Sequence, residues 1–308
     1  MIRTQRVAPL RTSRLLAYVR GRQFGSILFA VPAAAMLIVL SVFPMLVLLR
    51  MSVSDVTATT LRNEWAFVGL ANYIEGFANG GVQQASLNTV MFVAIVGSLG
   101  LLIGLLAALS LRISTRISAL VLALMVFVWA LPPVVNGSVW KFLLADSGLV
   151  NLLLSLVGIG PVPFLYDADF ALASVALVTV WAALPFNALV FRAAILGVPQ
   201  ELIEAARIDG VNRFQEVIHV IVPSIRPTVL VLAVLTIVYA FRSFDYIYVI
   251  TFGGPGIATN TLPFLGFLQA VMRFDYGLGA ATSVLTVLLV AALAVLYGRS
   301  IRREESEG

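Results

Sequence analysis

The chain has 308 residues, of which 60% are hydrophobic and 11% are charged, and its formal net charge is +5. Soluble domains carry about 25% charged residues, so this composition excludes a soluble globular protein and indicates an integral membrane protein. The sequence contains no cysteine and one histidine. Disulfides, thiolate metal sites and multi-histidine metal clusters are therefore excluded.

Six apolar stretches are long enough to cross a bilayer, which requires about 20 residues. They cover residues 26–49, 86–110, 118–143, 170–194, 223–247 and 279–299. The first is too long for the apolar core of a cleaved signal peptide, and no small-residue cleavage site follows it. The sequence predicts an all-α membrane protein whose six transmembrane helices form one domain over 26–300.

Basic residues are distributed unevenly between the spans. Six arginines and no acidic residue precede the first span, whereas the 144–169 loop has three aspartates and no basic residue. Because basic loops stay in the cytoplasm, both termini and the 195–222 loop are predicted to be cytoplasmic. The basic arm over 1–25 is interpreted as a topology determinant, with lipid binding as the alternative. Residues 301–308 form a cytoplasmic tail.

Several of the predicted spans contain prolines. Pro132 and Pro133 fall in the third span and Pro185 in the fourth. Neighbouring helices can satisfy the carbonyl groups that such prolines leave free. These residues are predicted to kink the helices and to open backbone toward a central cavity.

The 195–222 loop has the pattern of a short helix. Pro199 fits a first-turn position, acidic Glu201 and Glu204 follow, and Gly210 provides a stop or a point of close approach. A small-residue helix rimmed by charge can dock in a groove of a partner protein. A helix lying on the bilayer surface is the alternative, and the residues alone leave both interpretations open.

The same loop resembles the EAA signature of membrane subunits of binding-protein-dependent ABC importers. Glu204-Ala205-Ala206 precedes Gly210 by the family's three residues, and nine residues separate Gly210 from Val220-Ile221-Val222-Pro223. Val220 and Val222 replace Ile and Leu of the family's I-x-L-P. The resemblance implies the ABC type I importer transmembrane domain, with 195–222 as a coupling loop seated in the ATPase subunit. It assigns the ATPase contact to Glu204, Ala205, Ala206, Asp209 and Gly210.

A second block resembles sugar-importer permeases of the maltose and glycerol-3-phosphate type. It runs from Phe244 to Pro255 as F-D-Y-I-Y-V-I-T-F-G-G-P, with Thr259 and the later stretch 274–277 also matching. The pattern is typical of the first of two non-identical permeases. It implies inward transport of a sugar, or alternatively of a polyol phosphate, by alternating access in the bacterial inner membrane.

The resemblance also implies partners. These are a second six-span permease, an ATPase dimer, an extracytoplasmic sugar-binding protein and membrane lipid. The chain has no P-loop motif, so ATP and magnesium are expected to bind the partner ATPase, with no cofactor, metal or catalytic residue in this chain. Dispersed arginines at helix ends do not indicate a nucleic-acid partner.

Alignment with the maltose-type permease indicates candidate substrate contacts. Aromatic faces stack on sugars while hydroxyl and amide groups bond their hydroxyls. Ala240 stands where the family has an amide, so the maltose contact set is not reproduced. Helix packing is the alternative role for Ala182 and Ala183. The positions indicated are Ala182, Ala183, Phe186, Thr236, Tyr239, Ala240 and Ser243, with Asn187 as a further polar candidate.

Arg242 and Asp245 are ionisable residues near the outer end of the fifth span. Charges inside a span are costly and usually face a cavity or a partner. At a spacing of three they would share a helix face and could neutralise each other. Alternatively, they line the substrate route.

Two other classes of membrane protein compete with the importer. A membrane-embedded transferase would need clustered catalytic groups, and Asp167 with Asp169 is the one candidate cluster; a solvated turn in an outer loop explains it better. A secondary transporter or channel would need more buried ionisable groups and would leave the EAA pattern without a role.

Overall fold

The computed structural model describes residues 31–307. The chain divides into two compact units, and the boundary between them along the sequence falls between Arg50 and Met51. The first described helix runs over Val31–Ser52 and starts in the first unit. It includes a π-helical turn, η1 (Ile38–Val42), followed by α2 (Phe43–Ser52). The predicted basic arm over 1–25 and the start of the first span lie outside the described residues.

Five described helices are long and apolar enough to cross a membrane. They are Val31–Ser52, α4 (Gly81–Ser110), α8 (Ala168–Leu196), Arg226–Ile250 and the Tyr276–Leu293 part of α15 (Tyr276–Glu307). The fourth of these consists of α12 (Arg226–Arg242) and α13 (Phe244–Ile250), which meet at Ser243. A sixth span exists only if the bent pair α5 (Arg116–Ala130) and α6 (Pro133–Leu143) is counted as one.

The predicted third span, 118–143, is therefore not one straight helix. Between α5 and α6 the chain bends by 104°. Leu131 and Pro132 adopt extended backbone, and Pro133 is the first residue of α6. Proline cannot continue the hydrogen bonds of a preceding helix and disfavours helical backbone in the residue before it. The kink expected at this proline pair is confirmed, and it is large enough to break the span.

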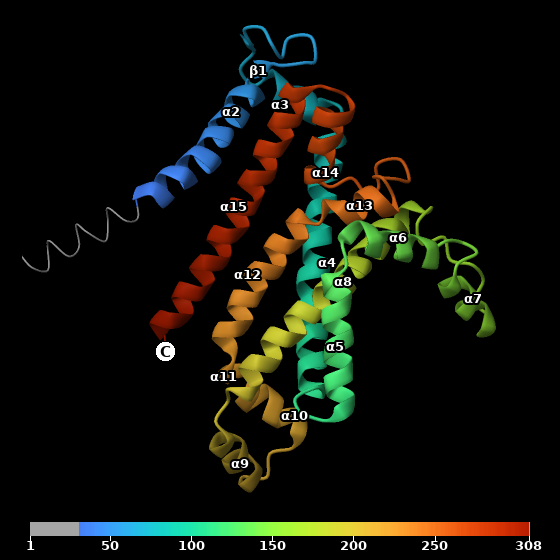
Figure 1. Ribbon diagram of the computed structural model, residues 1–308, viewed down its shortest axis with the longest axis vertical. Coiled ribbons are helices and arrows are strands. Elements are labelled where there is room, and N and C mark those ends of the chain that lie inside the picture. The colour runs from blue at the N-terminus through green and yellow to red at the C-terminus, as the bar shows by residue number, and fades with distance from the viewer. Residues whose placement is uncertain (1–30, 308) are drawn as a thin grey trace, which may run out of the picture. The chain divides into compact units, whose positions relative to one another are not determined.

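Short elements occupy the two ends of the second unit (Figure 1). At one end, β1 (Ser54–Asp55) pairs antiparallel with β2 (Ala66–Phe67), and α3 (Ala71–Ala78) follows. At the other end lies the loop after α8, with α9 (Gln200–Ile208), α10 (Arg213–Glu216), the π-helical turn η2 (Val217–Ile221) and α11 (Val222–Ser224). A further short helix, α7 (Leu149–Leu156), follows α6.

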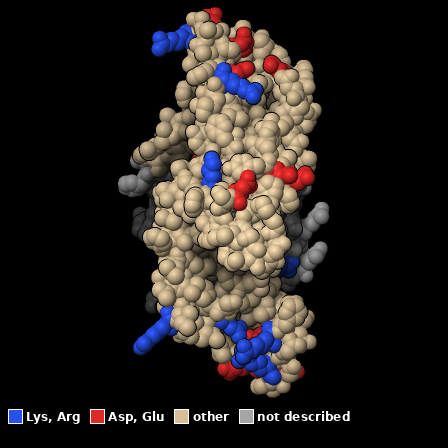
Figure 2. Space-filling view, turned by 90° about the vertical axis from the view of Figure 1, so that its right-hand side faces the viewer, with Lys and Arg blue, Asp and Glu red and all other residues tan. Residues whose placement is uncertain are grey.

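Charged side chains follow this arrangement. Figure 2 shows them gathered at the end that contains α9 and α10, at the opposite end, and in a smaller group near α6 and α7, with uncharged surface between. A lipid-facing surface requires such uncharged bands, because charged side chains are costly in hydrocarbon.

The core of the second unit is built on the packing of α4 along α8. Gly100 and Gly104 lie one turn apart on α4, and both face Asn187 of α8. A methyl group on Gly104 would lie 2.7 Å from the Asn187 Cβ, which is too close for two carbon atoms. Small residues four apart allow helix backbones to approach closely in membranes. Larger apolar side chains, including Phe92 and Val175, fill the space beside this contact.

The glycine-rich loop after α13 is fixed to α4 by buried polar groups. Asn88 Nδ2 donates to the carbonyl oxygens of Ile257 (3.2 Å) and Asn260 (2.9 Å), and the Leu262 N–H donates to Thr89 Oγ1 (2.8 Å). Within the loop, the hydroxyl oxygens of Thr251 and Thr259 lie 2.8 Å apart. The segment that follows the F-D…G-G-P block is therefore fastened to the first turns of α4.

A helical hairpin precedes the last span where the sequence indicated only a loop. It consists of α14 (Leu262–Phe267), the π-helical turn η3 (Leu268–Met272) and the start of α15. The hairpin is tight, because a methyl group on Gly279 would lie 2.7 Å from the Ala270 Cβ. Inside it, Thr282 Oγ1 donates a 2.6 Å hydrogen bond to Gln269 Oε1.

The Gly104→Ala substitution tests the close α4–α8 contact. The added methyl group must displace Asn187, and overpacking of this kind costs about 1–3 kcal/mol. We expect a lower apparent Tm in detergent. Gly97→Ala on the same helix is the matched control, because the nearest atom to its methyl group is 3.8 Å away. Equal Tm changes in the two variants would contradict the contact.

Candidate functional site

Helix α9 ends in a glycine-dependent cap. The Gly210 N–H donates to Arg207 O and the Val211 N–H donates to Ala206 O, each at 3.1 Å, while Gly210 has φ +82°. These two bonds form a Schellman motif, which requires left-handed backbone at the residue after the C-cap. Among the described residues, no atom lies within 4 Å of a methyl group placed on Gly210. The glycine is thus needed for its backbone conformation, as the predicted helix stop requires.

Most of α9 is exposed. Its one buried side chain is Ile203, and the opposite side presents what we call the docking face: Leu202, Ala205 and Ile208, with Ile208 86% exposed. Of the residues predicted to contact the ATPase, Glu204, Ala205, Asp209 and Gly210 are exposed and Ala206 is half-buried. Pro199 is the N-cap, one residue before the first turn. The exposed surface of α9 thus carries both apolar and acidic side chains that the described chain leaves uncovered.

Glu216 lies beneath this helix and is almost completely buried. Its carboxylate accepts hydrogen bonds from Arg112 Nη1 at 2.9 Å and from Arg207 Nε at 3.0 Å, and both contacts are ion pairs. Arg207 is in α9, and Arg112 is in the turn between α4 and α5. The hydrogen bond from Arg207, reinforced by Arg112, holds the pKa of Glu216 below its ordinary value. Glu216 was not among the residues predicted from the sequence. The feature that could have indicated it is its position as an acidic residue inside an otherwise amphipathic segment.

The turn between α4 and α5 is also attached to α8. Arg192 Nε donates to the Leu111 carbonyl oxygen at 2.8 Å, at the carboxyl end of α4. Helix α5 then begins in a capping box formed by Thr115 and Ser118. Such reciprocal caps fix the entry of the chain into a helix. The start of α5 is thereby held both to the loop after α8 and to α8 itself.

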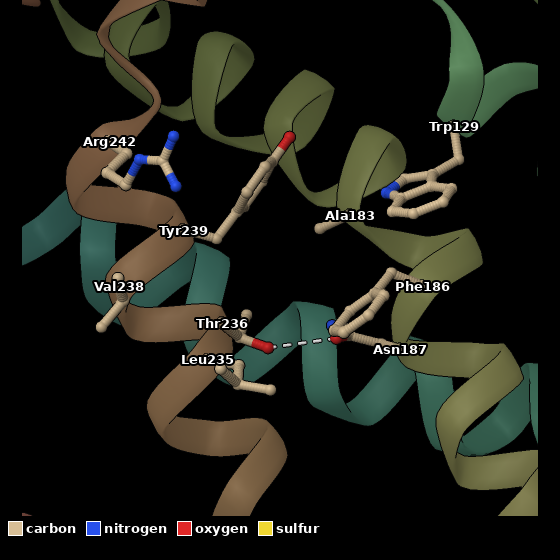
Figure 3. A pocket seen from close by; sticks show the side chains of 9 residues that line it. All are labelled: Trp129, Ala183, Phe186, Asn187, Leu235, Thr236, Val238, Tyr239 and Arg242. Carbon is tan, nitrogen blue, oxygen red and sulfur yellow. Dashed lines mark hydrogen bonds between the residues drawn. The ribbon is translucent and has the colours of Figure 1, made fainter. Parts of the chain in front are cut away.

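A pocket of about 240 Å³ lies between α5, α8 and α12 (Figure 3). It brings together five of the predicted pathway residues and Ala183. Trp129, which sequence analysis missed, stacks on Phe186 with ring centroids 6.0 Å apart. The sequence feature that could have indicated Trp129 is its position three residues before the proline pair, where the span was predicted to kink toward a cavity. The complete lining is Trp129, Ala183, Phe186, Asn187, Leu235, Thr236, Val238, Tyr239 and Arg242.

Two polar residues of the pocket bind each other. Thr236 Oγ1 donates to Asn187 Oδ1 at 3.1 Å (Figure 3). Asn187 Nδ2 in turn donates to the Gly100 carbonyl oxygen at 3.1 Å. Asn187 is buried. These bonds join α12, α8 and α4, so the residues that were predicted to contact substrate also hold three helices together.

The remaining predicted pathway residues lie elsewhere. Ala240 and Ser243 are buried beside Phe92 of α4, around a gap with no room for a water molecule, and Ala182 belongs to the core cluster. Their contact with substrate stays a prediction. Asp245 is half-buried and does not line the pocket.

The expectation that Arg242 and Asp245 share a helix face is wrong. Ser243 ends α12 and begins α13, with ψ +40°, so the two residues belong to different helices. In the part of the chain that the structure describes, they form no ion pair. The Arg242 guanidinium is exposed at the rim of the pocket.

A largely exposed helix α9, a pocket between apolar helices and several helices long enough to span a membrane are features expected of the membrane component of a transporter. The chain belongs to the family described as binding-protein-dependent transport system inner membrane component, whose model matches residues 100–305. It is a multi-pass permease subunit of an ABC importer in the inner membrane. As a permease subunit it is not an enzyme.

Several relatives are carbohydrate permeases. The chain is 32% identical to the trehalose/maltose permease MalF of Thermococcus litoralis, over 77% of this chain and 81% of the relative. It is 32% identical, over the same shares, to the sn-glycerol-3-phosphate permease UgpA of Yersinia pestis. Identity to the diacetylchitobiose permease DasB of Streptomyces coelicolor is 28%, over 96% and 92%. The carbohydrate-type, first-permease resemblance is confirmed.

The fold is similar to that of a solved importer. A bacterial ABC transporter that imports the acidic polysaccharide alginate matches with a TM-score of 0.77 and 20% identity, covering 94% of this chain and 99% of the other. At this identity the match establishes the fold alone, and that fold is the ABC importer transmembrane domain.

The ionised form of Glu216 should stabilise the loop in a defined pH range. Its pKa in the folded protein is below the ordinary 4.5, so the stabilisation is fully present above pH 4.5 and is lost as the pH falls through the folded-state pKa. We expect the Tm difference between wild type and Glu216→Gln, equivalent to about 1–3 kcal/mol, to be constant from pH 7 to 5 and to shrink below 4.5. A difference that shrinks already above pH 5 would contradict the lowered pKa.

Proposed function

We propose that this permease imports a sugar. It would form half of a translocation pathway that opens alternately to the two sides of the membrane, a switch driven by differential binding of its partners to the two states. The observation that carries the proposal is the pocket in which Trp129, Phe186 and Tyr239 surround a cavity between three helices. Aromatic faces suit the C–H surfaces of a sugar ring.

The orientation and the partners belong to the same proposal. Both termini and α9 lie in the cytoplasm, and α5 with α6 counts as one broken span, giving six. The exposed docking face seats in an ATPase dimer that binds ATP and magnesium. A second six-span permease completes the pathway, and an extracytoplasmic binding protein delivers the sugar. The binding-protein part of this proposal is supported by the crystal structure of the alginate transporter, a protein of similar fold, in complex with a periplasmic protein that holds an alginate pentasaccharide.

The Ala205→Glu substitution tests the docking face. A carboxylate buried in a protein groove without a partner is costly, and we expect at least about a tenfold loss of ATPase co-purification, which corresponds to about 1.4 kcal/mol. Ala168→Glu is the control, because Ala168 is also an exposed alanine and lies at the opposite end of α8 from the coupling loop. Undiminished co-purification of Ala205→Glu would place the ATPase contact elsewhere.

Phe186→Ala tests the pocket as the sugar route. Loss of the stacking surface should lower uptake of a neutral disaccharide about tenfold in proteoliposomes that contain the complete transporter, because an aromatic contact provides about 0.5–1.5 kcal/mol beyond its buried area. Phe170→Ala serves as the control, since Phe170 is a half-exposed aromatic residue of α8 outside this pocket. Equal uptake by both variants would exclude Phe186 from the route.

A second candidate substrate is a polyol phosphate such as glycerol-3-phosphate. The observation that favours it is Arg242, which lines the pocket without forming an ion pair with Asp245 in the described structure. Arginine is suited to binding phosphate through two parallel hydrogen bonds. Competition of labelled disaccharide uptake by glycerol-3-phosphate, or the reverse, distinguishes the two substrates.

A further inference from the structure

Glu216 connects two neighbouring elements of the loop after α8 with a turn that lies 104 residues earlier in the sequence. It belongs to α10, while its two partners belong to α9 and to the turn between α4 and α5. Arg207 contacts both carboxylate oxygens, Nε at 3.0 Å and Nη2 at 3.4 Å. A two-point contact of this kind fixes orientation as well as distance. The position of α9 relative to the α4–α5 turn is therefore set through one carboxylate.

The carboxylate is buried and the two arginines are not. Side-chain exposure is 2% for Glu216, 25% for Arg112 and 50% for Arg207. Removing the charge of Glu216 would leave two guanidinium groups facing each other across a neutral side chain. Loss of one partner of a buried carboxylate is costly, because the charges that remain lose their compensation. The arrangement therefore fixes the geometry of the junction as well as stabilising it.

Helix α5 extends from this junction to the pocket. It starts at the capped turn beside Arg112 and ends just after Trp129, whose ring stacks on Phe186. Its 15 residues span about 22 Å. A hydrogen-bonded helix moves as a stiff element, so a displacement at the turn reaches the indole ring.

We propose that Glu216 is a positioning residue that transmits movement of α9 through Arg112 to α5 and so to Trp129 at the pocket. The proposal rests on the proposed function, because α9 moves only if it is docked on an ATPase. It adds a second connection between the coupling loop and the pathway, parallel to the direct continuation of the chain into α8 and α12.

The first test measures geometry and needs no partner. The chain has no cysteine, so spin labels on two introduced cysteines, Arg116→Cys at the start of α5 and Glu201→Cys in α9, report one distance. Both positions are exposed. We expect a narrow distance distribution in wild type and one at least about twice as wide in Glu216→Gln. Equal widths would overturn the proposal.

The second test measures coupling in the complete transporter with its binding protein. Glu216→Gln should keep ATPase co-purification and basal hydrolysis but lose most of the stimulation by loaded binding protein, about tenfold. Arg112→Gln should produce the same loss, and the double variant should add little, because both remove one interaction. Arg213 is an exposed arginine of α10, the helix that contains Glu216. Arg213→Gln should leave the ratio of stimulated to basal ATP hydrolysis unchanged.

The outcomes are separable. Unchanged stimulation in Glu216→Gln would overturn the proposal, and so would loss of co-purification, which would mean that Glu216 merely folds the docking segment. Additive losses in the double variant would show that Arg112 and Glu216 act independently, again against it. A wild-type transporter without stimulated hydrolysis would contradict the proposed function instead, and the spin-label distances would still decide this inference.

Discussion

The close packing of α4 on α8 is the contact on which the rest of the second unit depends. Gly100 and Gly104 let the two helices approach, and Asn187 then reaches the Gly100 carbonyl and Thr236 of α12. In lipid, helices gain little from burying apolar surface against each other, so close contact and interhelical hydrogen bonds must hold them together. The pocket forms beside this contact, because α12 and α5 pack around the same stretch of α8.

How much of this the sequence could predict depends on the range of the interaction involved. Long apolar stretches predict spans because the bilayer thickness sets their length, and five of the six predicted spans match single continuous or nearly continuous helices among the described residues. The EAA spacing located α9, and the Gly210 stop followed from local backbone preference. Each of these signals is contained in consecutive residues.

The features that sequence analysis missed depend on distant residues. The first arm of the hairpin, α14 with η3, is only 11 residues long and contains Pro263, so its sequence resembles a loop until Ala270 is placed against Gly279 of α15. Arg242 and Asp245 have the spacing of a helical pair, but Ser243 ends the helix between them. Glu216 became recognisable as a junction only when Arg112, 104 residues earlier, was placed beside it.

The hydrogen bond between Thr236 and Asn187 has a consequence for how such permeases can diversify. The two side chains line the cavity and also fasten helices together, so changing either one to suit a different solute also weakens the framework. Substitutions elsewhere would first have to raise the stability of the fold enough to tolerate this loss. Replacement of Leu235, Val238 or Ala183, which line the same cavity without such bonds, is the less costly route to a new selectivity.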